Sequence, residues 1–186
     1  MIKGVIFDAD GTLLDSMGFW ESTVYDIIKM SGAEEHEPGL IEKLTPMSMY
    51  EGALYMKERY PIKMSVEEMI AEENGRVLDF YRTKVTLRSG MGELVEELFA
   101  KGTPMAVASA TEKAMIEAAL EHTGILDRFK GVLSCSDVGK GKDQPEIFLK
   151  ACELINTSPE DTLVVDDSPT AIATAKKAGF QTRLIS

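Results

Sequence analysis

The chain has 186 residues, of which 44% are hydrophobic and 27% charged, and its formal net charge is −11. A chain of this length buries roughly 70% of its unfolded surface, which predicts one full core and a small accessory unit. The acidic balance argues against binding to nucleic acid or to an anionic membrane, because both require clustered positive charge.

An apolar strand predicted over residues 5–7 ends in two carboxylates, Asp8 and Asp10. Side chains alternate along an extended strand, so these two carboxylates are expected to point the same way. Two unit charges ~4 Å apart repel by roughly 4 kcal/mol at an effective dielectric constant of ~20, and a divalent cation or a shared proton would relieve this. Gly11 permits a backbone turn, and Thr12 offers a hydroxyl and an N–H. The segment therefore favours a metal and an anionic substrate.

Between residue 16 and about residue 88 the sequence contains no convincing strand. Helical patterns are predicted at 18–30, 38–44, 49–59 and 66–84. Ser65 and Glu68 have the spacing of a capping box at the start of the last of these. We interpret residues 16–86 as a helical insert placed over the strand ends as a cap. Its methionines fit either the core of a small helical bundle or an adaptable lining that faces a substrate.

After the insert, helical and strand patterns alternate. Strands are predicted at 105–108, 131–133, 163–165 and 182–185, and helices at 91–100, 112–122, 145–154 and 169–178. Thr111 is a candidate N-cap of the second of these helices. Such alternation predicts right-handed crossovers and a three-layer parallel sheet.

Polar residues follow three of these strands, namely Ser109, Lys142 and the pair Asp166–Asp167. Taken singly, the serine also fits a turn or cap, the lysine a solvated loop, and the aspartates a helix cap. Ligands of open parallel sheets bind at the carboxyl ends of the strands, so we expect these side chains to converge on Asp8 and Asp10. Carboxylates together with phosphate oxygens suit Mg²⁺, and Ser109 and Lys142 would then hold the phosphate.

Four motifs occur in order along nearly the whole chain. They are Asp8-Ala9-Asp10-Gly11-Thr12, then Ser109, then Lys142 with Pro145-Glu146-Ile147-Phe148 downstream, then Asp166-Asp167-Ser168. In this the sequence resembles the haloacid dehalogenase-like hydrolases, in the small helical-cap branch of phosphoglycolate phosphatase and β-phosphoglucomutase. The resemblance implies an α/β fold, a Rossmann-like three-layer sandwich whose mainly parallel sheet has strand order 3-2-1-4-5. It places the core domain at residues 1–15 and 87–186 and an all-α cap at 16–86.

The resemblance also implies a Mg²⁺-dependent phosphatase that acts on a small phosphorylated metabolite. Asp8 would be the nucleophile and form an aspartyl-phosphate, and Asp10 would be the general acid and base. The metal would be bound by Asp8, the backbone carbonyl of Asp10, and Asp167, with Asp166 acting directly or through water. The phosphate group would be bound by Gly11, Thr12, Ser109, Ala110 and Lys142.

Three positions depart from the family pattern. Trp20 stands where mutases of this branch carry a histidine, and Met49 where they carry an arginine for a second phosphate. Both positions are candidates for substrate specificity, and both changes favour either a phosphatase over a phospho-sugar mutase or a substrate with a less polar body. Trp20 also fits a packing role inside the cap. Asp143 replaces the proline that usually follows the third-motif lysine, which could weaken or reorient Lys142.

Other functions remain open from the sequence alone. A phospho-sugar mutase is the nearest alternative. A 2-haloacid dehalogenase needs no metal and no second aspartate in the first motif, so Asp10 disfavours it. A phospho-accepting receiver domain is disfavoured by the long helical insert, and a non-catalytic binding protein by the full set of nominal catalytic residues.

The expected setting of the protein is the cytoplasm, as a monomer or weak dimer. Cys135 and Cys152 lie in apolar segments without metal-ligand spacing and are expected to be buried free thiols, which fits a reducing compartment. Residues 1–7 are too short for a signal-peptide core, and no apolar run approaches the ~20 residues of a membrane helix.

Overall fold

The computed structural model describes residues 2–33, 35–44, 47 and 49–185. The chain forms two compact units, Met1–Ser16 with Tyr81–Ser186, and Met17–Phe80. The sequence-based boundaries lie at 15/16 and 86/87, whereas the structure divides the chain at 16/17 and 80/81. Helix α4 (Val66–Thr83) crosses that division, and its last residues belong to the first unit.

The first unit is built on one parallel sheet. Its strands, in sheet order, are β3 (Val132–Ser134), β2 (Met105–Ser109), β1 (Gly4–Phe7), β4 (Thr162–Asp166) and β5 (Gln181–Leu184). All four neighbouring pairs are parallel. The predicted strand order 3-2-1-4-5 is therefore confirmed, with β1 at the centre.

Burial along the strands explains why apolar runs marked them in the sequence. Every residue of β1 and β2 is buried, as expected for strands that are covered on both faces, whereas β5 lies at an edge and is largely exposed. Two strands extend one residue beyond their apolar runs, so that Ser109 pairs with Ser134 and Asp166 with Leu184. These polar residues are thus held by the sheet itself.

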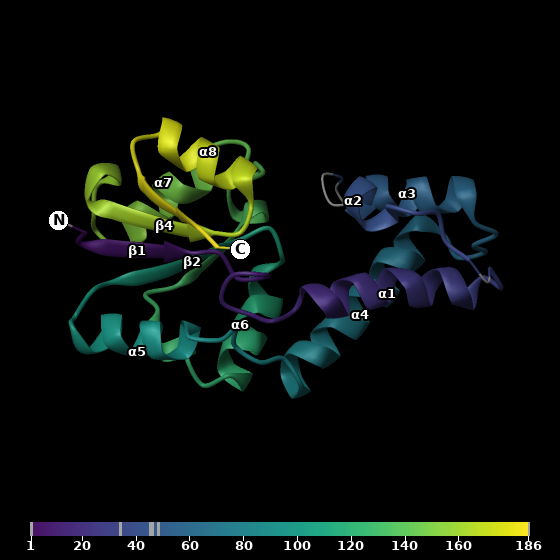
Figure 1. Ribbon diagram of the computed structural model, residues 1–186, viewed down its shortest axis with the longest axis horizontal. Helices are drawn as coiled ribbons and strands as arrows, with labels where there is room; N and C mark the ends of the chain where they lie inside the picture. Colours follow the sequence, from purple (N-terminus) through teal and green to yellow (C-terminus); the bar gives the residue numbers. More distant parts are fainter. Residues whose placement is uncertain (1, 34, 45–46, 48, 186) are drawn as a thin grey trace. The chain divides into compact units, whose positions relative to one another are not determined.

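Helices cover both faces of the sheet (Figure 1). Helices α5 (Met91–Ala100) and α6 (Lys113–His122) lie on one side, and α7 (Glu146–Leu154) and α8 (Pro169–Lys177) on the other. Short 3-10 turns connect some of these elements: Leu126–Arg128, Cys135–Asp137 and Pro159–Asp161. Strand and helix side chains share one apolar cluster that includes Ile6, Phe148 and Val164. The predicted three-layer α/β sandwich is confirmed.

Local signals at the helix ends gave mixed results. The capping box predicted at Ser65 and Glu68 is present, with each side chain accepting a hydrogen bond from the other residue's backbone N–H. The prediction that Thr111 caps α6 is wrong, because Glu112 occupies the N-cap position and makes no side-chain cap bond. The Thr111 hydroxyl instead donates to a carboxylate, as described below.

The second unit consists of helices only, in the part of it that the structure describes. They are α1 (Met17–Met30), α2 (Leu40–Leu44), α3 (Met49–Arg59) and the larger part of α4. Its apolar cluster contains Met56 and Met69, both almost fully buried, whereas Met30 is 56% exposed. The methionines of this unit therefore divide between core and surface.

Glu73 is half-buried on the apolar face of α4. It lies four residues from Met69 and from Val77, both fully buried, so the three side chains share one side of the helix. Within the described part of the chain Glu73 has no hydrogen bond or ion pair. Burial raises the pKa of this carboxyl from 4.5 to about 7.

Replacing Glu73 with glutamine is expected to flatten the pH dependence of stability. Between pH 4.5 and about 7 the folded chain holds a proton on Glu73 that the unfolded chain has lost, so the free energy of unfolding falls as the pH rises. The full effect, present above pH 7, is roughly 3 kcal/mol. Urea unfolding of both proteins at pH 5 and pH 8 measures it. A Glu35→Gln variant, at an exposed position, is the control. An equal pH slope in E73Q and wild type would contradict this prediction.

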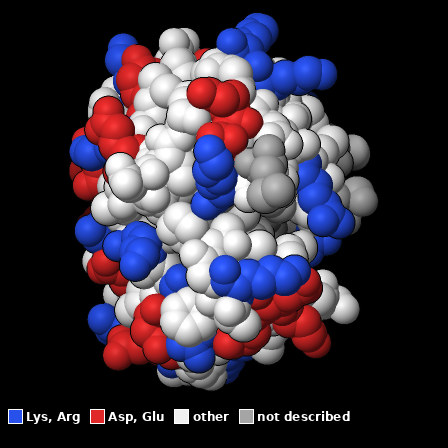
Figure 2. Space-filling model, turned by 90° about the vertical axis from the view of Figure 1, so that its left-hand side faces the viewer, with Lys and Arg blue, Asp and Glu red and all other residues white. Residues whose placement is uncertain are grey.

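The molecular surface carries both signs of charge. On the face drawn in Figure 2, lysine and arginine side chains are interspersed with aspartate and glutamate. No helix within the described ranges is long and apolar enough to cross a membrane.

Candidate active site

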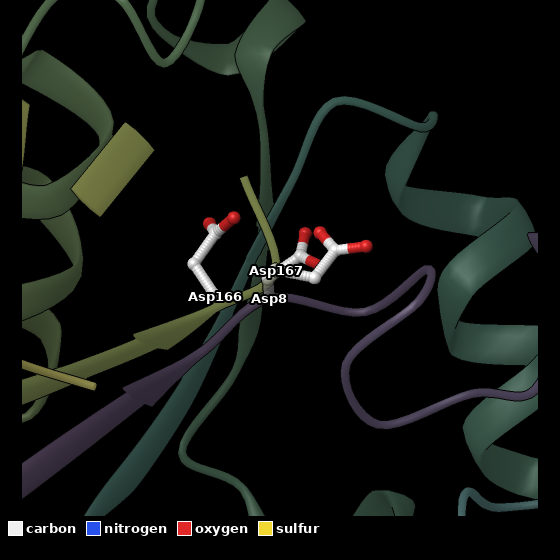
Figure 3. Close-up of side chains that lie close together, drawn as sticks. All are labelled: Asp8, Asp166 and Asp167. Carbon is white, nitrogen blue, oxygen red and sulfur yellow. The ribbon is translucent and has the colours of Figure 1, made fainter. Parts of the chain in front are cut away.

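Two aspartates occupy neighbouring positions at the carboxyl ends of the central strands. Phe7 of β1 pairs with Val165 of β4, so Asp8 and Asp166 come next on adjacent strands, and the Asp8 N–H donates to the Val165 carbonyl at 2.9 Å. Asp167 follows directly. Carboxylate oxygens of Asp8, Asp166 and Asp167 all lie within 4.8 Å of one another (Figure 3). The predicted convergence of these three residues is thus present in the fold.

Lys142 reaches this cluster from the loop after β3. Its ammonium donates to Oδ1 of Asp8 and, at 2.9 Å, to Oδ2 of Asp166. Only 12% of the Lys142 side chain is exposed, against 8% for Asp8 and 1% for Asp166. The presence of Asp143 beside Lys142 therefore does not turn the ammonium away from the carboxylates. The Asp143 carboxylate lies instead close to Gly141, where a β-carbon would meet it at 2.8 Å.

Burial dominates the electrostatics of the cluster. It raises the pKa of Asp8 to about 7, although the charge of Lys142 acts in the opposite direction. Burial and the neighbouring Asp166 likewise raise the pKa of Asp167. Burial alone would lower the pKa of Lys142, but the charges of Asp8 and Asp166 raise it above its ordinary value. The cluster thus contains three carboxylates and one ammonium group, which pairs with two of them away from solvent.

The residues of this cluster fit a divalent cation. Oδ2 of Asp8 is buried and has no hydrogen-bond partner among the described residues. A buried carboxylate oxygen without a partner is costly, and a cation bound by it and by Asp167 would supply the missing interaction. Carboxylates of this number, with water and phosphate oxygens, are the ligands that Mg²⁺ prefers.

Asp10 does not join the carboxylate cluster. Strand β1 ends at Phe7 and the chain turns at Gly11, whose φ is 77°, so the alternation expected for an extended strand does not continue as far as Asp10. Its Oδ1 accepts hydrogen bonds from Ser16 Oγ at 2.6 Å and from the Tyr81 hydroxyl, and its Oδ2 from Thr111 Oγ1 at 2.8 Å. The carboxylate cluster thus consists of Asp8, Asp166 and Asp167, and the expectation that the Asp10 carboxylate faces the same site stays a prediction.

The predicted phosphate ligands lie around the same strand ends. Ser109 ends β2, is 1% exposed, and its Oγ accepts the Thr111 N–H at 3.0 Å. Ala110 follows at an exposed position. The N–H groups of Gly11 and Thr12 are used inside the first loop, donating to the carbonyls of Leu14 and Ala9. The phosphate-binding role of these residues stays a prediction.

Trp20 and Met49, the candidate specificity residues, belong to the second unit. Trp20 lies on α1 and is half-buried, and Met49 begins α3 and is 37% exposed. Their role also stays a prediction.

Four side chains near the site were not predicted from the sequence to be functional. One of them, Thr111, was predicted to be a helix cap instead. Ser16, Tyr81 and Thr111 hold Asp10, and Arg88 donates from Nη1 to the Gly11 carbonyl. Ser16 lies close to the first motif and Thr111 close to Ser109, so their positions in the sequence could have indicated them. Tyr81 and Arg88 have no such signal, because only the fold brings them to the first loop.

Comparisons with known proteins agree with this geometry. Residues 5–185 match the family model described as haloacid dehalogenase-like hydrolase. The chain is 28% identical to a bifunctional riboflavin kinase/FMN phosphatase of Arabidopsis thaliana over 94% of its own length and 46% of the relative, so it spans about half of that protein.

Two further likenesses cover most of both chains. A phosphorylated carbohydrates phosphatase of Thermotoga maritima is 27% identical over 97% of this chain and 83% of that protein. A β-phosphoglucomutase structure from Clostridium difficile shares the fold, with a TM-score of 0.78 and 21% identity over 98% of this chain and 83% of the other. With a family model that matches residues 5–185, the chain belongs to the haloacid dehalogenase-like hydrolases.

Proposed function

We propose that this protein is a Mg²⁺-dependent phosphatase that hydrolyses a small phosphomonoester through an aspartyl-phosphate on Asp8. The observation that carries the proposal is the buried group of Asp8, Asp166 and Asp167 with Lys142 between two of them. Three carboxylates and one ammonium leave an excess of negative charge, which a phosphate alone could not approach. A cation held by Asp8 and Asp167, with Asp166 beside them, would balance that charge and keep Asp8 ionised.

Asp8 has the features of a nucleophile. One of its oxygens accepts from Lys142, which fixes the carboxylate, and the other has no partner among the described residues. An oxygen of Asp8 would attack the phosphorus as the bond from phosphorus to the leaving oxygen breaks. The product of this step is an aspartyl-phosphate and a free alcohol.

Asp10 is the proposed general acid and base. It would donate a proton to the leaving oxygen in the first step, and then take a proton from the water that attacks the phosphorus of the aspartyl-phosphate. This second step releases inorganic phosphate and restores the Asp8 carboxylate. Hydrogen bonds from Ser16, Tyr81 and Thr111 fix the orientation of the Asp10 carboxylate, which a group that transfers protons to and from a bound substrate requires.

Lys142 and Ser109 would stabilise the charge that develops on the transferred phosphoryl group. Lys142 is already held at the nucleophile, and the Ser109 hydroxyl lies at the end of the neighbouring strand. The names of the curated relatives, which are phosphatases, support the same reaction. Trp20 and Met49, in place of the mutase residues, support hydrolysis rather than transfer between two positions of a sugar.

Two measurements test the proposal. We expect p-nitrophenyl phosphate to be hydrolysed with Mg²⁺ and not with EDTA, and a panel of sugar phosphates, nucleotides and phosphoglycolate to contain better substrates. No phosphate release from any of them with Mg²⁺ would overturn the proposed function.

Magnesium is also expected to stabilise the folded protein independently of turnover. At a hundred times its dissociation constant, a ligand of the native state adds about 2.7 kcal/mol to the free energy of unfolding. Urea unfolding with Mg²⁺ and with EDTA measures this gain. Asp167→Asn should lose most of it, whereas Asp127→Asn, at a side chain that is 75% exposed, should keep it. An undiminished gain in D167N would show that the cation binds elsewhere.

A further inference from the structure

The Asp10 carboxylate is held by hydroxyl groups from three separate parts of the chain. Ser16 lies at the end of the first loop, Thr111 follows β2, and Tyr81 lies on the last turn of α4. Ser16 and Tyr81 donate to Oδ1, and Thr111 donates to Oδ2. Each oxygen of the carboxylate is therefore held from a different direction.

Tyr81 is the most unusual of the three donors. It is fully buried and ranks among the largest fully buried side chains of the chain. A phenylalanine would fill the space of the ring, and a buried hydroxyl is unfavourable unless it finds a partner. The Tyr81 hydroxyl finds that partner in Asp10, seventy-one positions away in the sequence. Packing alone thus accounts for the ring of Tyr81 but not for its hydroxyl.

An aspartate needs such external contacts to keep one orientation. The torsion that turns its carboxylate has broad, shallow preferences, unlike the staggered torsions of saturated side chains. Donors on both oxygens restrict this rotation, and Tyr81 adds a second donor to Oδ1 from a buried ring that cannot easily move.

We propose that Tyr81 is a positioning residue, which holds the Asp10 carboxylate in the orientation needed for proton transfer. The inference rests on the proposed role of Asp10 as general acid and base. Tyr81 itself would touch neither the substrate nor the phosphorus. Its effect is therefore expected in the rate of the chemical steps and not in substrate binding.

Tyr81→Phe tests this inference, because it removes the hydroxyl and keeps the ring. For an alkyl phosphomonoester, whose leaving oxygen requires a proton, we expect kcat to fall by about ten- to a hundredfold. KM should change less than about twofold, since uniform binding is untouched. For p-nitrophenyl phosphate, whose leaving group needs little protonation, the rate of phosphoenzyme formation should fall far less. The control Tyr50→Phe, at a tyrosine that is 53% exposed, should equal wild type.

A double variant separates positioning from packing. In the Asp10→Asn background, adding Y81F should change the residual kcat for the alkyl phosphomonoester by less than about twofold, because residues that act through one another are not additive. If the role of Tyr81 is purely structural, Y81F should lower kcat by the same factor whether residue 10 is aspartate or asparagine. That outcome, or a kcat of Y81F equal to wild type, would overturn the inference.

Other outcomes are equally decisive. If Y81F does not fold, Tyr81→Met, which is also apolar and lacks the hydroxyl, replaces it in both comparisons. If the wild-type protein releases no phosphate from any phosphomonoester, the proposed function itself fails and this inference falls with it. If wild type is active and Y81F has the same kcat, the role of Tyr81 is contradicted and the proposed function still stands.

Discussion

Replacing Asp8 with asparagine is expected to lower kcat by at least about ten-thousandfold, because the amide cannot attack phosphorus and no aspartyl-phosphate forms. The substitution preserves the shape of the side chain at the end of β1, and its amide oxygen can still accept from Lys142. Since burial raises the pKa of Asp8 to about 7, loss of the charge should leave the free energy of unfolding unchanged or slightly higher at pH 8. Turnover of aryl and alkyl phosphates, together with urea unfolding, measures both effects.

The matched control for this variant is Asp15→Asn. Asp15 lies seven residues further on and is exposed, and among the described residues only its backbone N–H is hydrogen-bonded, to the Thr86 carbonyl. It should retain wild-type turnover. More than about 1% of wild-type kcat in D8N would mean that another group is the nucleophile, since nucleophile removal in covalent enzymes costs several orders of magnitude.

Replacing Lys142 with methionine is expected to impair both activity and stability. Without the ammonium, Asp8 and Asp166 become two buried carboxylates side by side with no positive charge between them. Removing one partner of a buried ion pair typically costs 3–5 kcal/mol, so we expect a loss of about 3 kcal/mol in EDTA. Mg²⁺ should recover part of this loss, because a cation replaces some of the missing charge. Turnover with Mg²⁺ should fall by about a thousandfold, as when a donor to the developing charge is removed.

Lys140→Met is the control for K142M. Lys140 is exposed and lies in the same loop, two positions away. It should unfold at the wild-type urea concentration, with and without Mg²⁺. If K142M were as stable as K140M in EDTA, the buried carboxylates would be protonated rather than charged, and the electrostatic account of the cluster would be wrong.

The fold was predictable where local signals and burial agree. The apolar runs before Asp8, Ser109 and Asp166 are strands of a sheet that helices cover on both faces, so their hydrophobic character is nearly continuous along the sequence. The apolar runs locate the strands along the chain, but they do not determine which strands are neighbours in the sheet. The strand order came from the resemblance of the motifs to a family.

The site was predictable in part for a similar reason. Asp8, Asp166 and Asp167 come together because they end neighbouring parallel strands, which is a property of the topology. The orientation of Asp10 could not be predicted from strand alternation, because β1 ends at Phe7 and the chain turns at Gly11. Tyr81 could not be found, since one tyrosine in an amphipathic helix usually fills the core, and its contact with Asp10 depends on tertiary packing.

The chain leaves the first unit after Ser16 and returns to it at Tyr81, and these two residues lie close together. Ser16 and Tyr81, the last residue before the excursion and the first after it, both donate to the same oxygen of Asp10. Just beyond them the rings of Phe19 and Phe80 stack with centroids 4.1 Å apart. An insertion whose two ends adjoin interrupts no strand pairing. The sixty-four residues of the second unit can therefore vary in sequence without a change in the strand order of the sheet.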